Sequence, residues 1–369
     1  MGKKIIHKKT VFVGVSGGVD SSVAALLLQQ EGYTVVGVFI RTWQPDFIKC
    51  TWQDERRDAM RVCAYLSIPF LECDAEEAYK KGVADYMIDE YKKGNTPNPD
   101  VMCNREVKFG VFWDFAKAHG ADYIATGHYA VVKNKEKKDY QKLFTLSASP
   151  DSSKDQSYFL WTLTQEDLSH ILFPIGHLHK TKVRILAKKY NLPTAHKKDS
   201  QGVCFLGPLD MKDFLSHYIA VQKGEVLDEN NQSIGTHDGA VFFTLGERHG
   251  FTITKNSVLD KPYYVVSKDI ACNTITVAMK EKKDVLSHAT DFSGKEVGIQ
   301  NTNWIVTPPE EGKTYTAQIR YHGEYLKCII LPITSTESRV ILMISVVVSS
   351  GQSIVVYDKL QCIGGGVVL

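Results

Sequence analysis

Residues 14–22, Gly-Val-Ser-Gly-Gly-Val-Asp-Ser-Ser, constrain the fold of this chain most, because they lie between a short apolar run and an amphipathic helical pattern. Residues 9–15 are typical of a buried strand, and Val23 and Leu26 begin an apolar helix face that ends at Gly32. The glycines therefore occupy a strand-to-helix turn, whose backbone N–H groups and helix N-terminus together form a phosphate site. The segment predicts a nucleotide-binding loop in an α/β domain.

The loop has no lysine, whereas a Walker loop requires Gly-Lys-Ser/Thr, so transfer of a γ-phosphoryl group is not predicted. It resembles the pyrophosphate loop of the ATP pyrophosphatases, which cleave ATP between the α and β phosphates and adenylate an oxygen of their substrate. A plain Ser/Gly turn capped by Asp20 is the alternative, but the flanking strand and helix favour a phosphate loop.

Composition limits the remaining classes. The 369 residues suffice for two or three domains, and a net charge of +2 requires any nucleic-acid contact to come from local clusters, such as residues 133–138, 180–189 and 197–198. No apolar run approaches the length of a membrane span, and the basic N-terminus runs straight into the first strand, so a cytoplasmic protein is expected. The eight cysteines form no Cys-x-x-Cys pair, which disfavours a zinc ribbon; they are expected to be reduced, and no metal ligands are predicted.

Strand patterns at residues 11–15, 35–40, 69–73 and 123–126 alternate with helical patterns at 20–31, 54–66 and 109–119. This alternation predicts an α/β fold with a doubly wound parallel sheet over residues 1–210, with its ligand at the carboxyl ends of the strands. Short β-prone runs, including residues 240–245, predict a small β-rich domain over 211–282, and later runs predict a C-terminal β-barrel over 283–369.

Two loops carry cysteines in reactive settings. Residues 95–105 are held extended by two prolines and present Asp100 and Cys103 at a helix start, where Arg105 is expected to ease ionisation of the thiol. Residues 199–207 carry Cys204, with two lysines just ahead that favour a thiolate. Either cysteine could instead fill space under a turn. Beside an ATP loop, the pair suggests sulfur chemistry: one thiol carries a sulfane sulfur and the other releases it through a transient disulfide. An iron–sulfur cluster is the weaker alternative, because the ligand set is thin.

Further motifs follow in a characteristic order: Asn98-Pro99-Asp100, Cys103-Asn104-Arg105-Glu106, Ala125-Thr126-Gly127-His128-Tyr129, Lys154-Asp155-Gln156-Ser157-Tyr158, the Cys204 loop, His237-Asp238-Gly239, Arg320-Tyr321 and Gly364-Gly365-Gly366. Over nearly its whole length the chain resembles the tRNA-specific 2-thiouridylases, which convert the wobble uridine (position 34) of certain tRNAs to 2-thiouridine.

The resemblance implies a role for each matching position. Cys204 would hold a persulfide, Cys103 would resolve it, and Asp100 would be the acid/base near the target base. ATP, with Mg²⁺, would be bound by Gly14, Val15, Ser16, Gly17, Gly18, Val19, Asp20, Ser21, Ile40 and Gly127. The tRNA would be contacted by Asn98, Pro99, Asp100, His128, Lys154, Asp155, Gln156, Arg320, Tyr321 and Gln352. The expected partners are the tRNAs for Lys, Glu and Gln and a sulfur donor such as a cysteine desulfurase or a sulfur carrier.

Two positions depart from the pattern of the family. Ile40 stands where relatives often have Met, an apolar exchange. Residues 246–249 read Gly-Glu-Arg-His instead of the more usual Gly-Gln-Arg-Lys/His.

Several simpler interpretations also stay open. His128 could satisfy a buried carbonyl, Arg320 and Tyr321 could be a surface pair, and the terminal glycines could be a flexible tail. Two other functions also remain: an ATP-dependent ligase of a small metabolite, and a tRNA-binding protein without catalysis.

Overall fold

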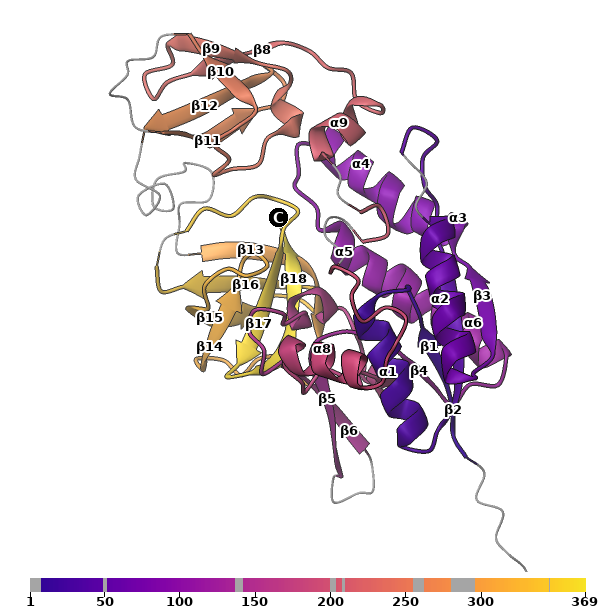
Figure 1. The fold of residues 1–369 in the computed structure, drawn as a ribbon. Coiled ribbons are helices and arrows are strands. Elements are labelled where there is room, and N and C mark those ends of the chain that lie inside the picture. Colours follow the sequence, from indigo (N-terminus) through magenta and orange to yellow (C-terminus); the bar gives the residue numbers. More distant parts are fainter. Residues whose placement is uncertain are drawn as a thin grey trace, which may run out of the picture.

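The computed structural model describes residues 8–48, 52–136, 142–199, 204–207, 210–254, 262–279, 296–344 and 346–369. Residues 137–138 of the first basic cluster, Cys50, and the residues 200–203 that precede Cys204 lie outside this set. The described residues form three sheets, which Figure 1 shows as an indigo-to-magenta α/β body, an orange sheet and a yellow barrel. In the described ranges, no helix is both long and apolar enough to cross a membrane.

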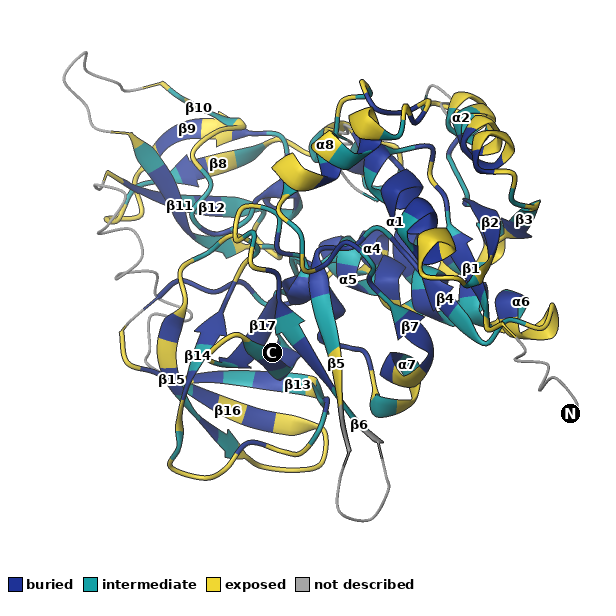
Figure 2. Cartoon of the chain, turned by 60° about the horizontal axis from the view of Figure 1, so that its bottom comes forward, coloured by how far each residue is buried: buried dark blue, intermediate teal, exposed yellow. Residues whose placement is uncertain are grey.

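The first sheet is parallel throughout. Its five strands are, in spatial order, β3 (Phe70–Asp74), β2 (Thr34–Arg41), β1 (Thr10–Gly14), β4 (Tyr123–Ala125) and β7 (Ile171–Leu172). Successive side chains of a strand point to opposite faces, so Val11 and Val13 pack on one side of β1 and Phe12 on the other. Both faces are therefore buried, and the predicted doubly wound parallel sheet is confirmed (Figure 2).

Helices cover both faces of this sheet. The residues around Val11 and Val13 pack against α1 (Val19–Gln30), α2 (Trp52–Leu66) and α8 (Lys180–Lys189). The other face is covered by α3 (Glu76–Tyr79), the π-helix η1 (Lys80–Asp85), α4 (Tyr86–Lys92), α5 (Pro99–Met102), the π-helix η2 (Cys103–Val111), α6 (Phe112–Ala118), the 3₁₀ turn η3 (Ser157–Leu160) and α7 (Gln165–His170). The sequence predicted β1, β2, β3 and β4 to within about a residue, but it predicted neither β7 nor a helix over residues 76–92.

The second sheet is mixed. It follows α9 (Met211–Ser216) and contains β10 (Phe251–Ile253), β9 (Ser233–His237), β8 (Gly224–Leu227), β12 (Thr274–Met279) and β11 (Tyr263–Asp269) in that order. The pair β8–β12 is parallel and the other pairs are antiparallel. The prediction of a β-prone run over residues 240–245 is wrong: Ala240–Phe242 form a 3₁₀ turn, η4. Gly239, at φ 141°, turns the chain there, and the Ala240 N–H donates to Asn273 Oδ1 at 2.9 Å.

The third sheet closes into the predicted C-terminal β-barrel. Six strands form the barrel, in the order β13 (Glu296–Trp304), β16 (Glu337–Leu342), β15 (Leu326–Pro332), β14 (Thr314–Gln318), β17 (Ser353–Asp358) and β18 (Gln361–Val368), and β13 pairs with β18 to close it. The hairpin β5 (Ala130–Glu136) and β6 (Lys142–Ala148) extends the same sheet, because β6 pairs with β18. The first and third parts of the chain therefore share one sheet and one core. The limits at 210 and 282 stay predictions.

The terminal glycines belong to β18 and are not a flexible tail. Gly364 and Gly365 pair with β13 on one side and with β17 on the other. Gly364 has φ 142°, and a Cβ built on it would lie 2.0 Å from the Asn303 carbonyl oxygen. Only glycine fits there, since both the backbone conformation and the close approach exclude a side chain.

Gly364→Ala is expected to destabilise the protein far more than Gly312→Ala. Gly312 also has a positive φ (75°), but a methyl group added to it would have no atom within 4 Å. Gly312→Ala therefore measures backbone strain alone, about 1 kcal/mol. Gly364→Ala adds overpacking of about 1–3 kcal/mol. Urea unfolding measures both, and equal losses in the two variants would contradict the packing assigned to β18.

Candidate active site

The loop after β1 is shaped as a phosphate cradle. Gly18 is the N-cap of α1, and its carbonyl accepts from Ser22 Oγ at 2.6 Å. Gly17 has φ 69°, and a Cβ on it would lie 2.6 Å from the Glu55 carbonyl oxygen and 2.8 Å from Asp58 Cβ. The loop is thus packed closely against α2, and its backbone can turn there only with glycine. The N-terminus of a twelve-residue helix lies directly behind it.

Three neighbouring strands bring the predicted nucleotide residues together at their carboxyl ends. Gly127 follows β4, and a Cβ on it would lie 2.7 Å from the Ser21 nitrogen, so this backbone touches the start of α1. Ile40, near the end of β2, is buried, and its Cδ1 would lie 3.6 Å from a Cβ added to Gly14. This edge is where open α/β sheets hold their ligands.

A network of charged residues lies beside the loop. Both carboxylate oxygens of Asp20 lie 2.7 Å from Lys180 Nζ, and Tyr129 Oη donates to the same carboxylate at 2.8 Å. Asp199 pairs with Lys180 and Lys154, each at 3.0 Å, and with Arg184. Burial opposes ionisation of Asp199, but hydrogen bonds from the two lysines outweigh it and hold its pKa well below the usual range.

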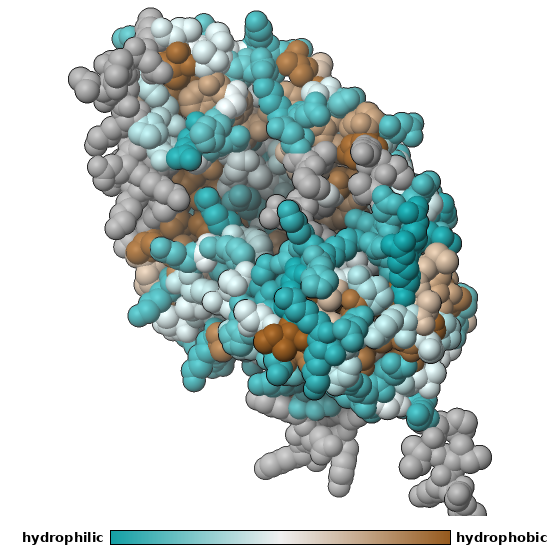
Figure 3. All heavy atoms as spheres, viewed as in Figure 1, coloured by the Kyte–Doolittle hydropathy of each residue, from teal (hydrophilic) through white to brown (hydrophobic). Residues whose placement is uncertain are grey.

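Three cations thus face two carboxylates, which leaves positive charge for a polyphosphate. Lys180 and Arg184 belong to the stretch 180–189, in which the sequence indicated only a basic cluster or a solvated face. The signal that could have identified these two residues is their place on the first turns of α8, a helix that packs against α1 beside the phosphate loop. The surface over α8 is largely hydrophilic in the view of Figure 3.

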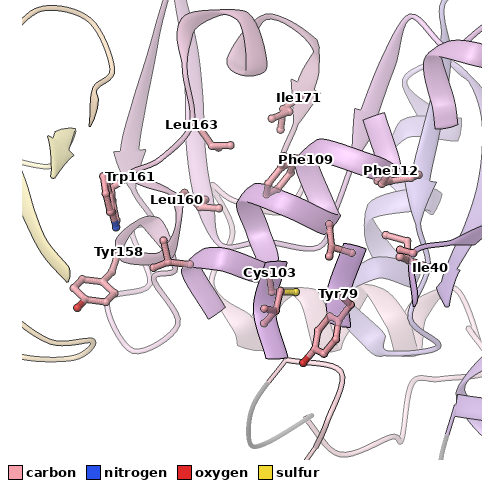
Figure 4. Close-up of a cluster of buried hydrophobic side chains, with 14 of the residues drawn as sticks. Ile40, Tyr79, Cys103, Phe109, Phe112, Tyr158, Leu160, Trp161, Leu163 and Ile171 are labelled. Carbon is pink, nitrogen blue, oxygen red and sulfur yellow. The ribbon is translucent and has the colours of Figure 1, made fainter. Parts of the chain in front are cut away.

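The two thiols lie together, Cys103 buried and Cys204 half-buried, although they come from distant parts of the chain. Cys103 begins η2, and its thiol is hydrogen-bonded to the thiol of Cys204. The Cys204 segment is fixed at both backbone groups: its N–H donates to Asp100 Oδ1 at 3.0 Å, and its carbonyl accepts from Tyr79 Oη at 2.7 Å. Figure 4 shows Cys103 and Tyr79 at the same end of the buried cluster. The structure therefore groups Asp100, Cys103 and Cys204, as the sequence predicted.

The two thiols differ in how readily they ionise. The hydrogen bond from Cys103 and the charge of Lys108 outweigh burial and lower the pKa of Cys204 to about 7. Burial, together with Cys204, raises the pKa of Cys103 well above its usual value. The expectation that Arg105 eases ionisation of Cys103 is wrong, because Arg105 pairs with Glu106 at 2.7 Å. These opposite pKa shifts favour Cys204 over Cys103 as the nucleophile.

The cation beside Cys204 is Lys108, and sequence reasoning missed it. The lysines just ahead of the Cys204 loop were the expected source of the charge, but Lys197 pairs with Asp58 at 2.9 Å. Lys108 lies five residues after Cys103, and a π-helix, whose hydrogen bonds join residues five apart, covers both. An α-helix would turn these side chains to different faces, so only the π-helical geometry could have revealed the pairing.

The predicted tRNA-contacting residues fall into two groups. Some make internal bonds: His128 and Asp155 are buried, Gln156 Oε1 accepts from the Tyr129 N–H at 3.0 Å, and Lys154 pairs with Asp199. His128 Nδ1 bonds with the Thr126 hydroxyl at 2.7 Å and its pKa lies well below the usual value, because of burial and of the nearby Lys108. The sequence left open that His128 satisfies a buried carbonyl, but the partner of its Nδ1 is a side-chain hydroxyl.

The second group lines the joint between the barrel and the Asp100 loop. Asn98 caps α5 through the Val101 N–H, and Pro99 is the first residue of that helix. The Thr96 N–H donates to the Ser350 carbonyl at 2.7 Å, which brings the turn that contains Gln352 against this loop. Tyr321 packs on Phe159, with ring centroids 4.3 Å apart, and Arg320 is exposed. The tRNA roles of both groups stay predictions.

A phosphate loop and an ionisable thiol pair in one α/β domain define an enzyme of ATP-dependent sulfur transfer. Three family models match the chain: a tRNA methyl transferase HUP domain over residues 9–208, a tRNA methyl transferase PRC-barrel domain over 212–279, and an aminomethyltransferase beta-barrel domain over 295–368. The first two descriptions mention methyl transfer, for which the paired thiols have no evident use.

Curated relatives are similar over nearly their whole length, and each is named tRNA-specific 2-thiouridylase MnmA. The protein of Geobacillus thermodenitrificans is 40% identical over 99% of this chain and 96% of its own. That of Blochmanniella floridana is 42% identical over 98% and 96%, and that of Bacillus subtilis 40% over 97% and 94%. The chain belongs to the tRNA-specific 2-thiouridylase family.

The Cys103 hydrogen bond is expected to control ionisation of Cys204. In the wild-type protein, alkylation of Cys204 should rise with pH with a midpoint near its lowered pKa of about 7. Cys103→Ala removes the donor and should raise this midpoint by about one unit or more, whereas Cys103→Ser keeps a donor and should shift it less.

Peptide mass spectrometry after timed alkylation reads each cysteine separately. The exposed Cys272, whose pKa is raised by its hydrogen bond with Asp269, serves as the internal control and should respond identically in all variants. An unchanged Cys204 profile in Cys103→Ala would show that the thiol hydrogen bond does not activate Cys204.

Proposed function

We propose that this protein, an ATP-dependent tRNA-specific 2-thiouridylase, converts the wobble uridine at position 34 of tRNA to 2-thiouridine in two steps, adenylation and sulfur transfer. The observation that carries the proposal is the hydrogen-bonded pair of Cys103 and Cys204, with Asp100 bound to the Cys204 backbone. A metabolite ligase of the same superfold has no use for such a pair, and a binding protein has no use for the phosphate loop beside it.

In the first step the uracil oxygen at carbon 2 attacks the α-phosphorus of ATP, and pyrophosphate leaves. The loop from Gly14 to Ser21 binds the phosphates through backbone N–H groups, and Lys180, Lys154 and Arg184 offset their charge. Ile40 and Gly127 form apolar and close-packed walls for the nucleoside. Asp20 offers the carboxylate ligand that Mg²⁺ requires; Mg²⁺, when bound, would neutralise charge on the departing pyrophosphate.

In the second step the terminal sulfur of a Cys204 persulfide attacks carbon 2, and AMP leaves with the oxygen. Cys103 then attacks Cys204 Sγ: the bond between Cys204 and the transferred sulfur breaks, its electron pair stays on the sulfur of the base, and a Cys103–Cys204 disulfide forms. Asp100, whose pKa is raised by burial, receives the proton that Cys103 must release. A dithiol reductant then supplies two electrons to restore both thiols.

The tRNA is expected to lie across the joint between the α/β sheet and the barrel. Exposed Arg320 can pair with a phosphate, and Tyr321 offers a ring face on which a base could stack. The wobble base leaves the anticodon stack to reach Asp100, at a smaller cost than in a duplex. The tRNAs for Lys, Glu and Gln, a cysteine desulfurase or sulfur carrier as donor, and a cytoplasmic location complete the proposal.

The assay that tests it combines the protein with ATP, Mg²⁺, a persulfide source and bulk tRNA, followed by mass spectrometry of the nucleosides. The wild-type protein should form 2-thiouridine, whereas Cys204→Ala should form none because it lacks the sulfur carrier. Cys103→Ala should retain a persulfide on Cys204 without turnover, because nothing resolves it. Both should still consume ATP on tRNA once.

Cys272→Ala is the matched control, because that thiol is exposed and lies in the turn between β11 and β12 of the second sheet. It should make 2-thiouridine at the wild-type rate. A persulfide found on Cys103 and absent from Cys204 would reverse the two roles. Pyrophosphate release from ATP and a small metabolite that is unchanged in a Cys103→Ala, Cys204→Ala double variant would favour the metabolite ligase.

A further inference from the structure

Lys108 reaches the thiol pair from inside the α/β domain. It lies within η2, half-buried, and its Nζ lies 5.6 Å from the centre of the Phe205 ring, the residue next to Cys204. Phe205 has φ 65°, a backbone conformation that residues other than glycine seldom adopt, and its carbonyl accepts from Gln44 Nε2 at 3.1 Å. The loop is therefore held in a strained shape that keeps Cys204 beside the ammonium group.

The titratable groups that face Lys108 are Cys103 on η2, Asp100 on α5, His128 after β4, and Cys204. Tyr79 on α3 faces the same thiols and Asp100. Burial and nearby negative groups keep Tyr79 protonated, since its pKa is raised well above the usual value. His128 is neutral, because its pKa is lowered. Burial opposes the charge of Lys108, but Cys204, Cys103 and Asp100 outweigh burial and raise its pKa.

Three other cations near these loops are already paired. Arg105 holds Glu106 at 2.7 Å, Lys197 holds Asp58 at 2.9 Å, and Lys154 holds Asp199 at 3.0 Å. A negative sulfur in this pocket is partly removed from water and needs a counter-charge close by. Among the described residues around the pair, Lys108 is the cation whose hydrogen bond reaches Cys204.

The geometry points to Lys108 as a further catalytic residue of the thiol pair, whose ammonium group binds the sulfur of Cys204 and is the counter-ion of its persulfide. The inference rests on the proposed function and deepens it. Before transfer, Lys108 offsets the charge of the persulfide. When that sulfur attacks carbon 2, the charge leaves with AMP; when Cys103 then loses its proton and attacks, the same ammonium offsets the new thiolate until the charge passes to the thiolated base.

The test replaces Lys108 with Gln, which removes the charge, and with Arg, which keeps it. Timed alkylation of Cys204 over a range of pH, read by peptide mass spectrometry, needs neither ATP nor tRNA. Lys108→Gln should raise the midpoint by about one unit, so that alkylation near neutral pH slows about tenfold. Lys108→Arg should keep a midpoint close to that of the wild type.

Lys198→Gln is the matched control, because it removes an equal charge from an exposed residue near the same loop and should leave the profile in place. Each variant is also loaded with inorganic polysulfide, and the persulfide on Cys204 is counted by mass spectrometry. Lys108→Gln should hold at least about fivefold less persulfide at neutral pH than the wild type, and Lys108→Arg should hold nearly as much.

Two outcomes would overturn the inference: a folded Lys108→Gln protein with the wild-type profile, or a Lys108→Arg protein shifted as far as Lys108→Gln. Thermal unfolding establishes which variants are folded. If Lys108→Gln does not fold, Lys108→Arg alone decides, because an effect that depends only on charge must survive an exchange that keeps the charge. If Lys108→Gln shifts the alkylation profile of Cys204 but the wild-type protein makes no 2-thiouridine, the counter-ion role of Lys108 stands and the proposed function is rejected. Failure of the inference and failure of the proposed function are therefore distinguishable.

Discussion

The hydrogen bond from the Cys204 N–H to the Asp100 carboxylate joins two segments 104 residues apart, and the chemistry of the pocket depends on it. Tyr79 holds the carbonyl of the same residue, so the position of the Cys204 sulfur is set by backbone contacts on both sides of its Cα. Cys103 can then donate to that sulfur, which makes one thiol acidic and leaves the other protonated. Two identical side chains thereby acquire different reactivities.

The same folding unit places the phosphate loop at the carboxyl edge of the parallel sheet, with Asp199 between the two regions. Asp199 binds Lys180, which also holds Asp20 of the loop, and it lies in the segment that leads toward Cys204. The barrel is tied to this arrangement through β6, which pairs with β18, and through the Thr96 N–H bond to Ser350. The phosphate loop, the thiols and the face expected to receive tRNA thus lie on directly connected parts of the fold.

Local patterns were enough to predict much of this. The strands β1 to β4 were recognised because continuous apolar runs alternate with helices, and the phosphate loop because its glycines stand at a strand-to-helix turn. The hairpin β5–β6 was missed, since its first strand is rich in lysine and its second strand joins the rest of the sheet through β18, far along the chain. Lys108 and Tyr79 were missed because a π-helix and a long-range hydrogen bond, neither visible in the sequence, bring them to the thiols.

The central claim, that one pocket activates the uracil oxygen with ATP and replaces it with the Cys204 sulfur, is tested most directly by following that oxygen. A tRNA transcribed with uridine carrying oxygen-18 at carbon 2 would be thiolated in a single turnover, and the AMP would be analysed by mass spectrometry. The account predicts one labelled oxygen in each AMP for each 2-thiouridine formed, because the carbon–oxygen bond of the base breaks. Unlabelled AMP, with the heavy oxygen released to water, would contradict it.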